Sequence, residues 1–179
     1  NLTGADDFAF VRSGSSSAYL LRGGNQPLYV GVAEPGVTLR IGVPIINGSG
    51  GLYKHGAGVL ELDAPSTFTG TLVVSDGLAR YGASGDLAVI ALMTWSDGVF
   101  DFAGKTDTLG AVTLYSGFLT NSAAGGALTI STLTFGGGPT GSAARVDTGT
   151  GTLKLGGTVT YDNSNHPETA VLDGNVNLN

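Results

Sequence analysis

The sequence contains no cysteine, so it builds neither a disulfide framework nor a thiolate metal site. Only 12% of its 179 residues are charged, which is about half of the usual share. The eight lysines and arginines are scattered and the formal net charge is −6, so there is no basic stripe for nucleic acid or an anionic membrane surface. No apolar run reaches the ~18 residues of a membrane helix, so we expect no transmembrane segment.

Helical periodicity and an N-terminal signal are also missing. The best helical candidate is residues 86–95, but Val89, Ile90 and the flanking glycines favour a buried strand over a turn of helix. The chain opens on Asn1, without the methionine or the basic start of a signal peptide. We therefore expect it to be processed, or to be a fragment of, or a subunit in, a longer array.

Glycines and short alternating strands fill the sequence instead. There are 31 glycines, more than double the average frequency, and glycine supplies the positive φ angles of tight turns. Between the turns, apolar residues recur at every second position, and such residues share one side of a strand. The predicted inward sets are Phe8/Phe10, Leu28/Val30/Val32, Val37/Leu39/Ile41/Val43, Leu60/Leu62, Leu72/Val74, Phe100/Phe102, Val112/Leu114, Leu128/Ile130, Leu133/Phe135, Leu153/Leu155, Val159/Tyr161 and Val176/Leu178.

Two all-β architectures bury strands of this kind. A parallel β-helix, or solenoid, stacks each strand on its counterpart one coil later. Self-similarity favours it, because the segment Gly51–Leu62 is echoed by Asp147–Leu155, and we expect a single solenoid domain over residues 1–179. An antiparallel β-sandwich is the alternative, since four dipeptides suit hairpin turns: Asn47-Gly48, Asp76-Gly77, Asp97-Gly98 and Asp173-Gly174.

The stretch Pro44–Leu78 reads PIINGSGGLYKHGAGVLELDAPSTFTGTLVVSDGL. It resembles the autotransporter-associated β-strand repeat, also called the passenger-associated transport repeat, and the recognisable repeat covers about residues 44–82. His55 stands where the family has a small polar residue, and the corner is one glycine shorter than in many copies. The residues at motif positions are Gly50, Gly51, Leu52, Lys54, Gly56, Gly58, Leu60, Leu62, Phe68, Thr69, Gly70, Gly77 and Leu78.

The resemblance implies a right-handed parallel β-helix in a secreted or cell-surface protein associated with the bacterial outer membrane. Relatives are passenger domains or long surface proteins with many copies of the repeat. The family signature is structural, so it implies no catalytic residue, cofactor or metal ligand. Because open strand edges are normally capped or extended, we also expect end-to-end stacking into a filament or another homo-oligomer. Surface glycans and neighbouring cells are further expected partners.

The pair Lys54–His55 raises the question of acid–base chemistry. It lies between Leu52 and a Gly-x-Gly turn, where alternation sends the two side chains in different directions. A solvated or stacking pair explains it. The turn from Gly56 to Gly58 is not a nucleotide-binding loop, because no helix follows.

The densest acidic group is Asp97, Asp101 and Asp107, and convergent carboxylates are what a polysaccharide lyase or hydrolase needs. Asp97 lies in a predicted turn and Asp101 alternates outward between two phenylalanines. Asp107 follows Lys105, which would partly neutralise it. Turn and surface roles account for all three, so a polysaccharide-binding or polysaccharide-degrading β-helix is the alternative to a structural module.

Other polar segments do not suggest a catalytic or calcium site. Asp6-Asp7 and residues 162–165 are oxygen-rich, but neither has the spacing of a calcium loop. His166 sits beside a proline in a predicted turn, far in sequence from His55. We therefore expect that the protein is not an enzyme.

Trp95 and nearby Tyr81 are a candidate sugar-stacking platform. Trp95 follows the apolar run VIALM, and partly buried core is the simpler interpretation. The leading hypothesis is accordingly a structural or adhesive rod.

Overall fold

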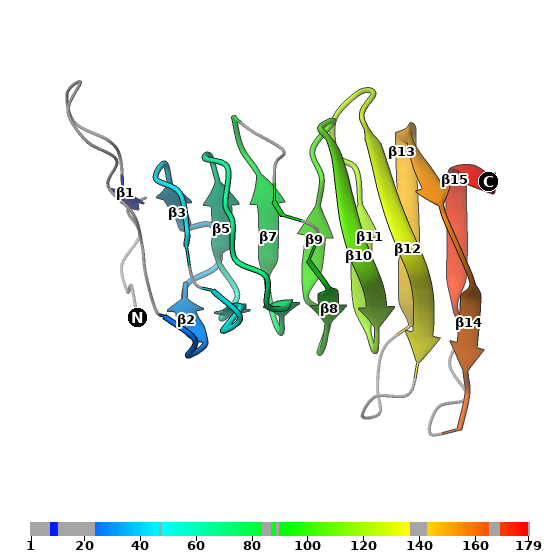
Figure 1. Ribbon diagram of the computed structural model, residues 1–179, viewed down its shortest axis with the longest axis horizontal. Helices are drawn as coiled ribbons and strands as arrows, with labels where there is room; N and C mark the ends of the chain where they lie inside the picture. The colour runs from blue at the N-terminus through cyan, green and yellow to red at the C-terminus, as the bar shows by residue number, and fades with distance from the viewer. Residues whose placement is uncertain are drawn as a thin grey trace.

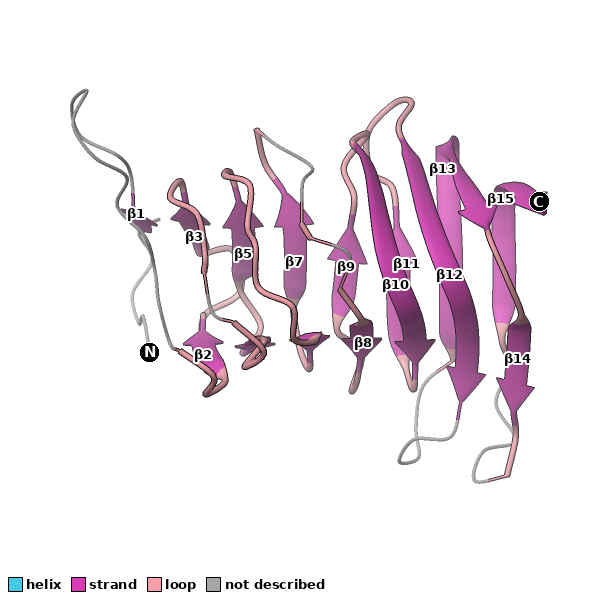
Figure 2. Cartoon of the chain, in the orientation of Figure 1, coloured by secondary structure: helices cyan, strands magenta, loops and turns pink. Residues whose placement is uncertain are grey.

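The computed structural model describes residues 8–10, 24–46, 48–83, 87–88, 90–136, 143–164 and 169–178. These residues form strands and turns, with no helix among them (Figure 2). Accordingly, no helix in this part of the chain is able to span a bilayer. All strand pairs are parallel, and the chain winds into a β-solenoid of about six turns. Figure 1 shows the strands following one another along the long axis, from β2 in blue to β15 in red.

Three parallel ladders run along the solenoid. Ladder 1 contains β1 (Phe8–Phe10), β3 (Thr38–Ile41), β5 (Val59–Leu62), β7 (Leu78–Tyr81), β9 (Val99–Asp101), β11 (Gly117–Thr120) and the first parts of β13 (Ala144–Leu155) and β15 (Val171–Leu178). Ladder 2 contains the first parts of β10 (Thr106–Leu114) and β12 (Ala127–Gly136) and the last parts of β13 and β15. Ladder 3 contains β2 (Leu28–Gly31), β4 (Leu52–His55), β6 (Leu72–Val74), β8 (Leu92–Thr94), the last parts of β10 and β12, and β14 (Val159–Asp162).

Residues one coil apart lie directly over one another. In ladder 3, Leu52 pairs with Leu72, Leu72 with Leu92 and Leu92 with Val112, a step of 20 residues each time. The backbone N–H of Leu52 donates to the carbonyl oxygen of Thr71 at 3.0 Å. Neighbouring parallel strands are ~4.8 Å apart, so side chains in one column touch along the rod axis.

The antiparallel sandwich is not formed, because the Asp-Gly dipeptides do not reverse the chain. They lie at bends between ladders, where the N–H of Gly77 donates to Asp76 Oδ1 at 2.7 Å and that of Gly174 to Asp173 Oδ1 at 2.8 Å. Asn47, of the fourth dipeptide, lies outside the described residues. The 86–95 segment also follows the solenoid, since it contains strand β8, Leu92–Thr94.

The predicted inward residues form the core through the middle of the rod. Burying a Val, Leu or Phe side chain stabilises the fold by ~1.5–3 kcal/mol relative to leaving it exposed. Columns such as Leu60, Phe100 and Leu119 in ladder 1 are 0–1% exposed. The predicted residues found buried are Val32, Val37, Leu39, Ile41, Val43, Leu60, Leu62, Leu72, Val74, Phe100, Phe102, Val112, Leu114, Leu128, Ile130, Leu133, Phe135, Leu153 and Leu155.

Burial was wrongly expected for three residues of the last coil. Val159 is 45% exposed, Tyr161 50% and Leu178 72%. They continue inward columns, but no described strand packs beyond β14 and β15 to cover them. Alternation therefore placed them in the right column, and their position in the last described coil explains their exposure.

Candidate functional site

The glycines of the repeat-like segment lie at two stacks of bends. Gly56, Gly58 and Gly77 turn the chain from ladder 3 to ladder 1, and Gly77 has a φ of 63°. A Cβ atom on Gly77 would lie 2.5 Å from the carbonyl oxygens of both Gly56 and Gly58. Gly50, Gly51 and Gly70 occupy the bend that enters ladder 3.

The apolar residues of the same segment divide between the core and the outer side. Leu52, Leu60, Leu62 and Phe68 are 0–2% exposed, whereas Leu78 is half-buried on the outer side of β7. The segment thus contributes coil geometry and core volume.

The sequence predicted a solvated or stacking Lys54–His55 pair, and the solvated form is wrong for Lys54, because Lys54 lies inside the solenoid. It is 0% exposed and pairs with Val74 in an inward column of ladder 3. Its Nζ donates to the carbonyl oxygen of Gly56 and, at 2.9 Å, to that of Asp76. His55 is exposed at the end of β4.

The Lys54 ammonium group links the bends of two successive coils. Burial lowers the pKa of Lys54 from 10.5 to about 8, and the charge of Asp76 opposes this shift only in part. Thr94, two rungs further along the column, acts similarly and donates its hydroxyl to the carbonyl oxygen of Ser116 at 2.7 Å. Both side chains therefore satisfy bend carbonyls that are shielded from water.

The acidic residues Asp97, Asp101 and Asp107 are spread over one coil. Asp97 lies in the bend between ladders 3 and 1, where its φ is 69°. Asp107, in β10, accepts hydrogen bonds from the hydroxyl of Tyr81 and, at 3.0 Å, from the N–H of Leu87. Asp97 thus lies in a bend, and the Asp107 carboxylate is occupied by hydrogen bonds within the protein. The two carboxylates therefore do not form a common substrate site.

Asp101 has the outward register predicted for it, but the predicted surface role is wrong. It is only 3% exposed. Its Oδ1 accepts from the N–H groups of Ala103 at 2.8 Å and Ser122 at 3.0 Å, and the Ser122 hydroxyl donates to Oδ2. The next coil covers the carboxylate, which closes the bend instead of facing water.

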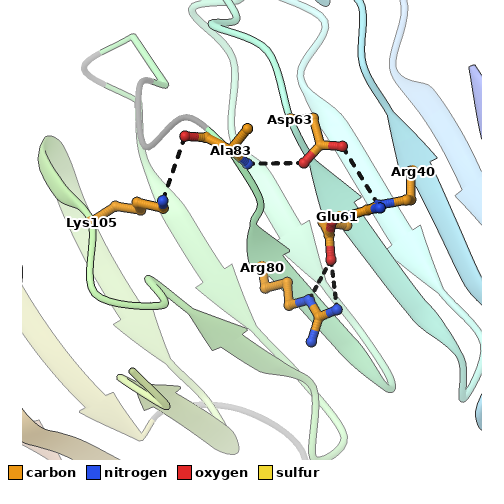
Figure 3. A network of polar contacts seen from close by, with 6 residues as sticks. All are labelled: Arg40, Glu61, Asp63, Arg80, Ala83 and Lys105. Atoms are coloured by element: carbon orange, nitrogen blue, oxygen red, sulfur yellow. Dashed lines mark hydrogen bonds and ion pairs between the residues drawn. The ribbon is translucent and has the colours of Figure 1, made fainter. Parts of the chain in front are cut away.

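An ion-pair ladder that the sequence analysis missed lies on the outer side of ladder 1. Arg40, Glu61 and Arg80 occupy the same register position in β3, β5 and β7. Glu61 Oε1 accepts from Arg40 Nε at 2.6 Å, and Oε2 accepts from Arg80 Nε at 2.8 Å. Figure 3 also shows Asp63 beside Arg40, where Asp63 Oδ2 is 3.6 Å from Arg40 Nε. The sequence contains a signal for this ladder, because residues of opposite charge recur at a spacing of one coil. That signal can be recognised only once the coil length is known.

Glu61 is the enclosed member of this ladder. Its side chain is 4% exposed, whereas those of Arg40 and Arg80 are 53% and 38% exposed. Burial alone would raise the pKa of Glu61, but the hydrogen bonds and charges of the two arginines outweigh it and hold the pKa below its ordinary value. An ionised carboxylate with both oxygens occupied is a poor general acid or base, so Glu61 acts as an anchor for the guanidinium groups.

A cleft of about 420 Å³ opens beside the ladder. Across it, Asp63 Oδ1 accepts from the N–H of Ala83 at 2.9 Å, and Lys105 Nζ approaches the carbonyl oxygen of Ala83 at 3.5 Å (Figure 3). These contacts join successive coils, so the cleft is a polar seam of the rod. The lining residues are Arg40, Glu61, Asp63, Arg80, Tyr81, Gly82, Ala83, Ala103 and Ser122.

The proposed platform of Trp95 and Tyr81 is not formed. Tyr81 is 2% exposed and packs edge-to-face on Phe100, with ring centroids 5.3 Å apart. Trp95 is partly buried, as the sequence predicted, but it does not belong to the core cluster of the described residues. Its ring centroid is 4.3 Å from that of Tyr115, a partner 20 residues along the chain.

Several polar candidates lie outside the described residues, namely Asp6, Asp7, Asn165, His166 and Pro167. Asp162 is described, and its Oδ1 accepts from the N–H of Ser164 at 3.0 Å within a local turn. Among the residues whose placement is described, no group of three or more His, Asp or Glu side chains is positioned to hold a metal ion.

Comparisons with family models, curated proteins and solved structures found no match to this chain. The likeness of Pro44–Leu78 to the autotransporter-associated repeat is therefore a resemblance in residues alone. Of what that resemblance implies, the structure shows the parallel β-solenoid.

Proposed function

We propose that this chain is a structural segment of a secreted or cell-surface rod, which lengthens by stacking coil upon coil. The observation that carries the proposal is the exposure of large apolar side chains in the last described coil. Tyr161 pairs with Phe135 and Leu178 with Leu155 in columns that are buried elsewhere, yet Tyr161 is 50% and Leu178 72% exposed. An apolar end whose strands have a described partner on one edge only favours the addition of another parallel strand.

The first described coil of a second copy offers a matching surface. Val30 begins the ladder 3 column that ends at Tyr161, and Leu28 begins the column that ends at Val159. Leu28 and Val30 are partly buried and pack against the core. β1 lies one coil before β3, so β1 of a second copy would add to the edge of β15 in ladder 1, and Leu28 and Val30 would continue the ladder 3 columns one coil further on. Burial of this surface contributes ~25 cal/mol per Å².

The cell-surface location and the adhesive role come from the resemblance of Pro44–Leu78 to passenger-associated repeats. A rod suits that role because its length grows with each coil while its width stays constant. The proposed role involves no catalysis, cofactor or metal.

The test of end-to-end assembly is a double variant, Tyr161→Asp with Leu178→Asp. We expect the wild-type chain to form rods in negative-stain electron microscopy whose lengths are multiples of one monomer, and to sediment faster as its concentration rises. The double variant should remain monomeric, because two carboxylates would be buried in the contact. Thr108→Asp is the control, since Thr108 is exposed in β10, a strand that pairs with β8 on one side and β12 on the other.

Wild-type chains that stay monomeric at high concentration would overturn this proposal, as would assemblies that persist in the double variant. Catalysis is tested separately by incubation with polysaccharides. We expect no release of reducing ends. Release that is lost in Asp97→Asn or Asp107→Asn would instead favour the polysaccharide-degrading alternative.

A further inference from the structure

Aromatic side chains line the outer side of ladder 3 over several coils. Tyr29 and Tyr53 are register partners in β2 and β4, with ring centroids 5.1 Å apart. Trp95 and Tyr115 directly follow β8 and β10, and their ring centroids are 4.3 Å apart. Met93 lies two residues before Trp95 in the column that begins at Tyr29, and Val73 occupies the coil between Tyr53 and Met93. We call the four aromatic residues and Met93 the aromatic strip.

The aromatic strip is not part of the core. Tyr29 is 65% exposed, and the other four side chains are half-buried. None of the five belongs to the core cluster of the described residues. Partly exposed aromatic residues that extend along one side of a protein mark a site of interaction more often than scattered apolar residues do.

The side of the rod that carries the aromatic strip has few charges. The outward positions of β2, β4, β6 and β8 and of the last part of β10 hold no Asp, Glu, Lys or Arg. The outer side of ladder 1, by contrast, carries the Arg40–Glu61–Arg80 ladder. The nearest carboxylates in sequence are Asp76 and Asp97, which lie in the bends. The outward residues of ladder 3 are Tyr29, Gly31, Tyr53, His55, Val73, Met93 and Thr113.

We propose that the aromatic strip binds a neutral polysaccharide lying along the rod axis. The flat C–H surface of a sugar ring packs on the face of an aromatic ring, and hydroxyl groups remain free for polar neighbours. His55, Ser75 and Thr113 lie next to the strip and supply such neighbours. The uncharged surface suits a ligand without charge. Rungs repeat every ~4.8 Å, so one chain meets several rings and weak contacts add up.

The chain has a single tryptophan, so its fluorescence reports on the aromatic strip directly. Laminarin, hydroxyethylcellulose and galactomannan are the neutral probes, and polygalacturonate is the charged comparison. We expect at least one neutral probe to change the Trp95 emission saturably, while polygalacturonate binds at least tenfold more weakly. Tyr115→Ala and Tyr53→Ala should each weaken binding by roughly tenfold, because each removes one ring on which a sugar stacks.

Phe118→Ala is the matched control, because Phe118 is an outward aromatic residue on ladder 1 and should not affect binding. Affinity electrophoresis in gels that contain each polysaccharide measures binding independently of Trp95. Failure of all three neutral probes in both assays would overturn the proposal, and so would equal weakening by Phe118→Ala. Sedimentation that shows a side-by-side dimer, dissociated by Tyr53→Ala, would assign the strip to a second copy instead. The Tyr161→Asp/Leu178→Asp variant should retain binding, so this test does not depend on end-to-end assembly.

Discussion

Lys54 shows how a single residue departs from the expectation of local alternation. Its neighbours one and two rungs away in the column are Val74 and Thr94, so an inward position normally holds an apolar or small side chain. The lysine stem fills that volume while the ammonium group reaches the bend carbonyls of Gly56 and Asp76. A charge at this position is partly desolvated, and that makes the stability of the rod dependent on pH.

We predict that the Lys54 proton opposes folding at neutral pH. Because the folded-state pKa of about 8 lies below the unfolded value of 10.5, the unfolded chain binds the proton more tightly. The contribution of Lys54 to stability therefore rises as the pH increases from about 8 to about 10.5. Relative to Lys54→Met, the wild-type free energy of unfolding should rise by about 2 kcal/mol between pH 7 and pH 10. Urea unfolding at both pH values measures it, and a constant difference would contradict the shift.

Gly77 is a bend glycine at which the packing of neighbouring coils excludes a side chain. Gly77→Ala places a Cβ 2.5 Å from two backbone oxygens, whereas Gly36→Ala has no atom within 4 Å, and both glycines have positive φ. Both variants should lose ~1 kcal/mol from the left-handed conformation. Gly77→Ala should lose about 2 kcal/mol more through overpacking. Equal losses in chemical denaturation would show that the bend relaxes freely.

At the scale of elements, alternation predicted most strands but not their assignment to ladders. The structure joins Thr106–Leu114 into one strand that crosses from ladder 2 to ladder 3, where the sequence suggested only the pair Val112 and Leu114. The echo between Gly51–Leu62 and Asp147–Leu155 is also not a repeat of one coil position. The first segment turns from ladder 3 to ladder 1 and the second from ladder 1 to ladder 2. Both kinds of bend have similar glycine-rich sequences.

The ion-pair ladder across β3, β5 and β7 should stabilise the rod in a pH-dependent manner. We expect Glu61→Gln to lower the free energy of unfolding by about 1–2 kcal/mol at pH 7, because two guanidinium groups would lose their common carboxylate. Since the folded-state pKa of Glu61 is depressed, the wild-type advantage is present at neutral pH. The advantage of the wild type over Glu61→Gln should disappear as the pH falls through the folded-state pKa of Glu61.

Asp147→Asn is the matched control for the Glu61 prediction. Asp147 Oδ2 lies 3.0 Å from Arg145 Nη2, and the two side chains of this ion pair are 43% and 41% exposed. Solvent screens such a pair, so its loss should cost less than ~0.5 kcal/mol. Comparable losses in the two variants, or a Glu61→Gln effect independent of pH between 3 and 7, would contradict the role of burial.

At the scale of the whole molecule, the solenoid is a one-dimensional stack. Each coil contacts only the coils before and after it, because register partners lie about one coil apart. Central strands are thus covered on both edges, whereas β14 and β15 have a described partner on one edge only. Local stability should therefore fall toward that end.

Native-state hydrogen exchange should reveal this gradient in the isolated chain. We expect the backbone amides of β14 and β15 to exchange at least ~10-fold faster than those of β5, β7 and β9. Assembly at high concentration should slow exchange in β14 and β15, provided that the end-stacking proposal holds. Uniform protection along the rod at low concentration would contradict a stack that frays from its uncovered coil.

Local sequence alone determined most of the strands, most of their inward residues and the glycine bends. The physical reason is that side-chain alternation and φ preferences are set within a few neighbouring residues. Only the tertiary structure decided that Lys54 and Asp101 are buried, that Glu61 meets two arginines and that Trp95 meets Tyr115. Each of these outcomes depends on which residue lies one coil away, and that is set by coil length and register, which no short stretch of sequence contains.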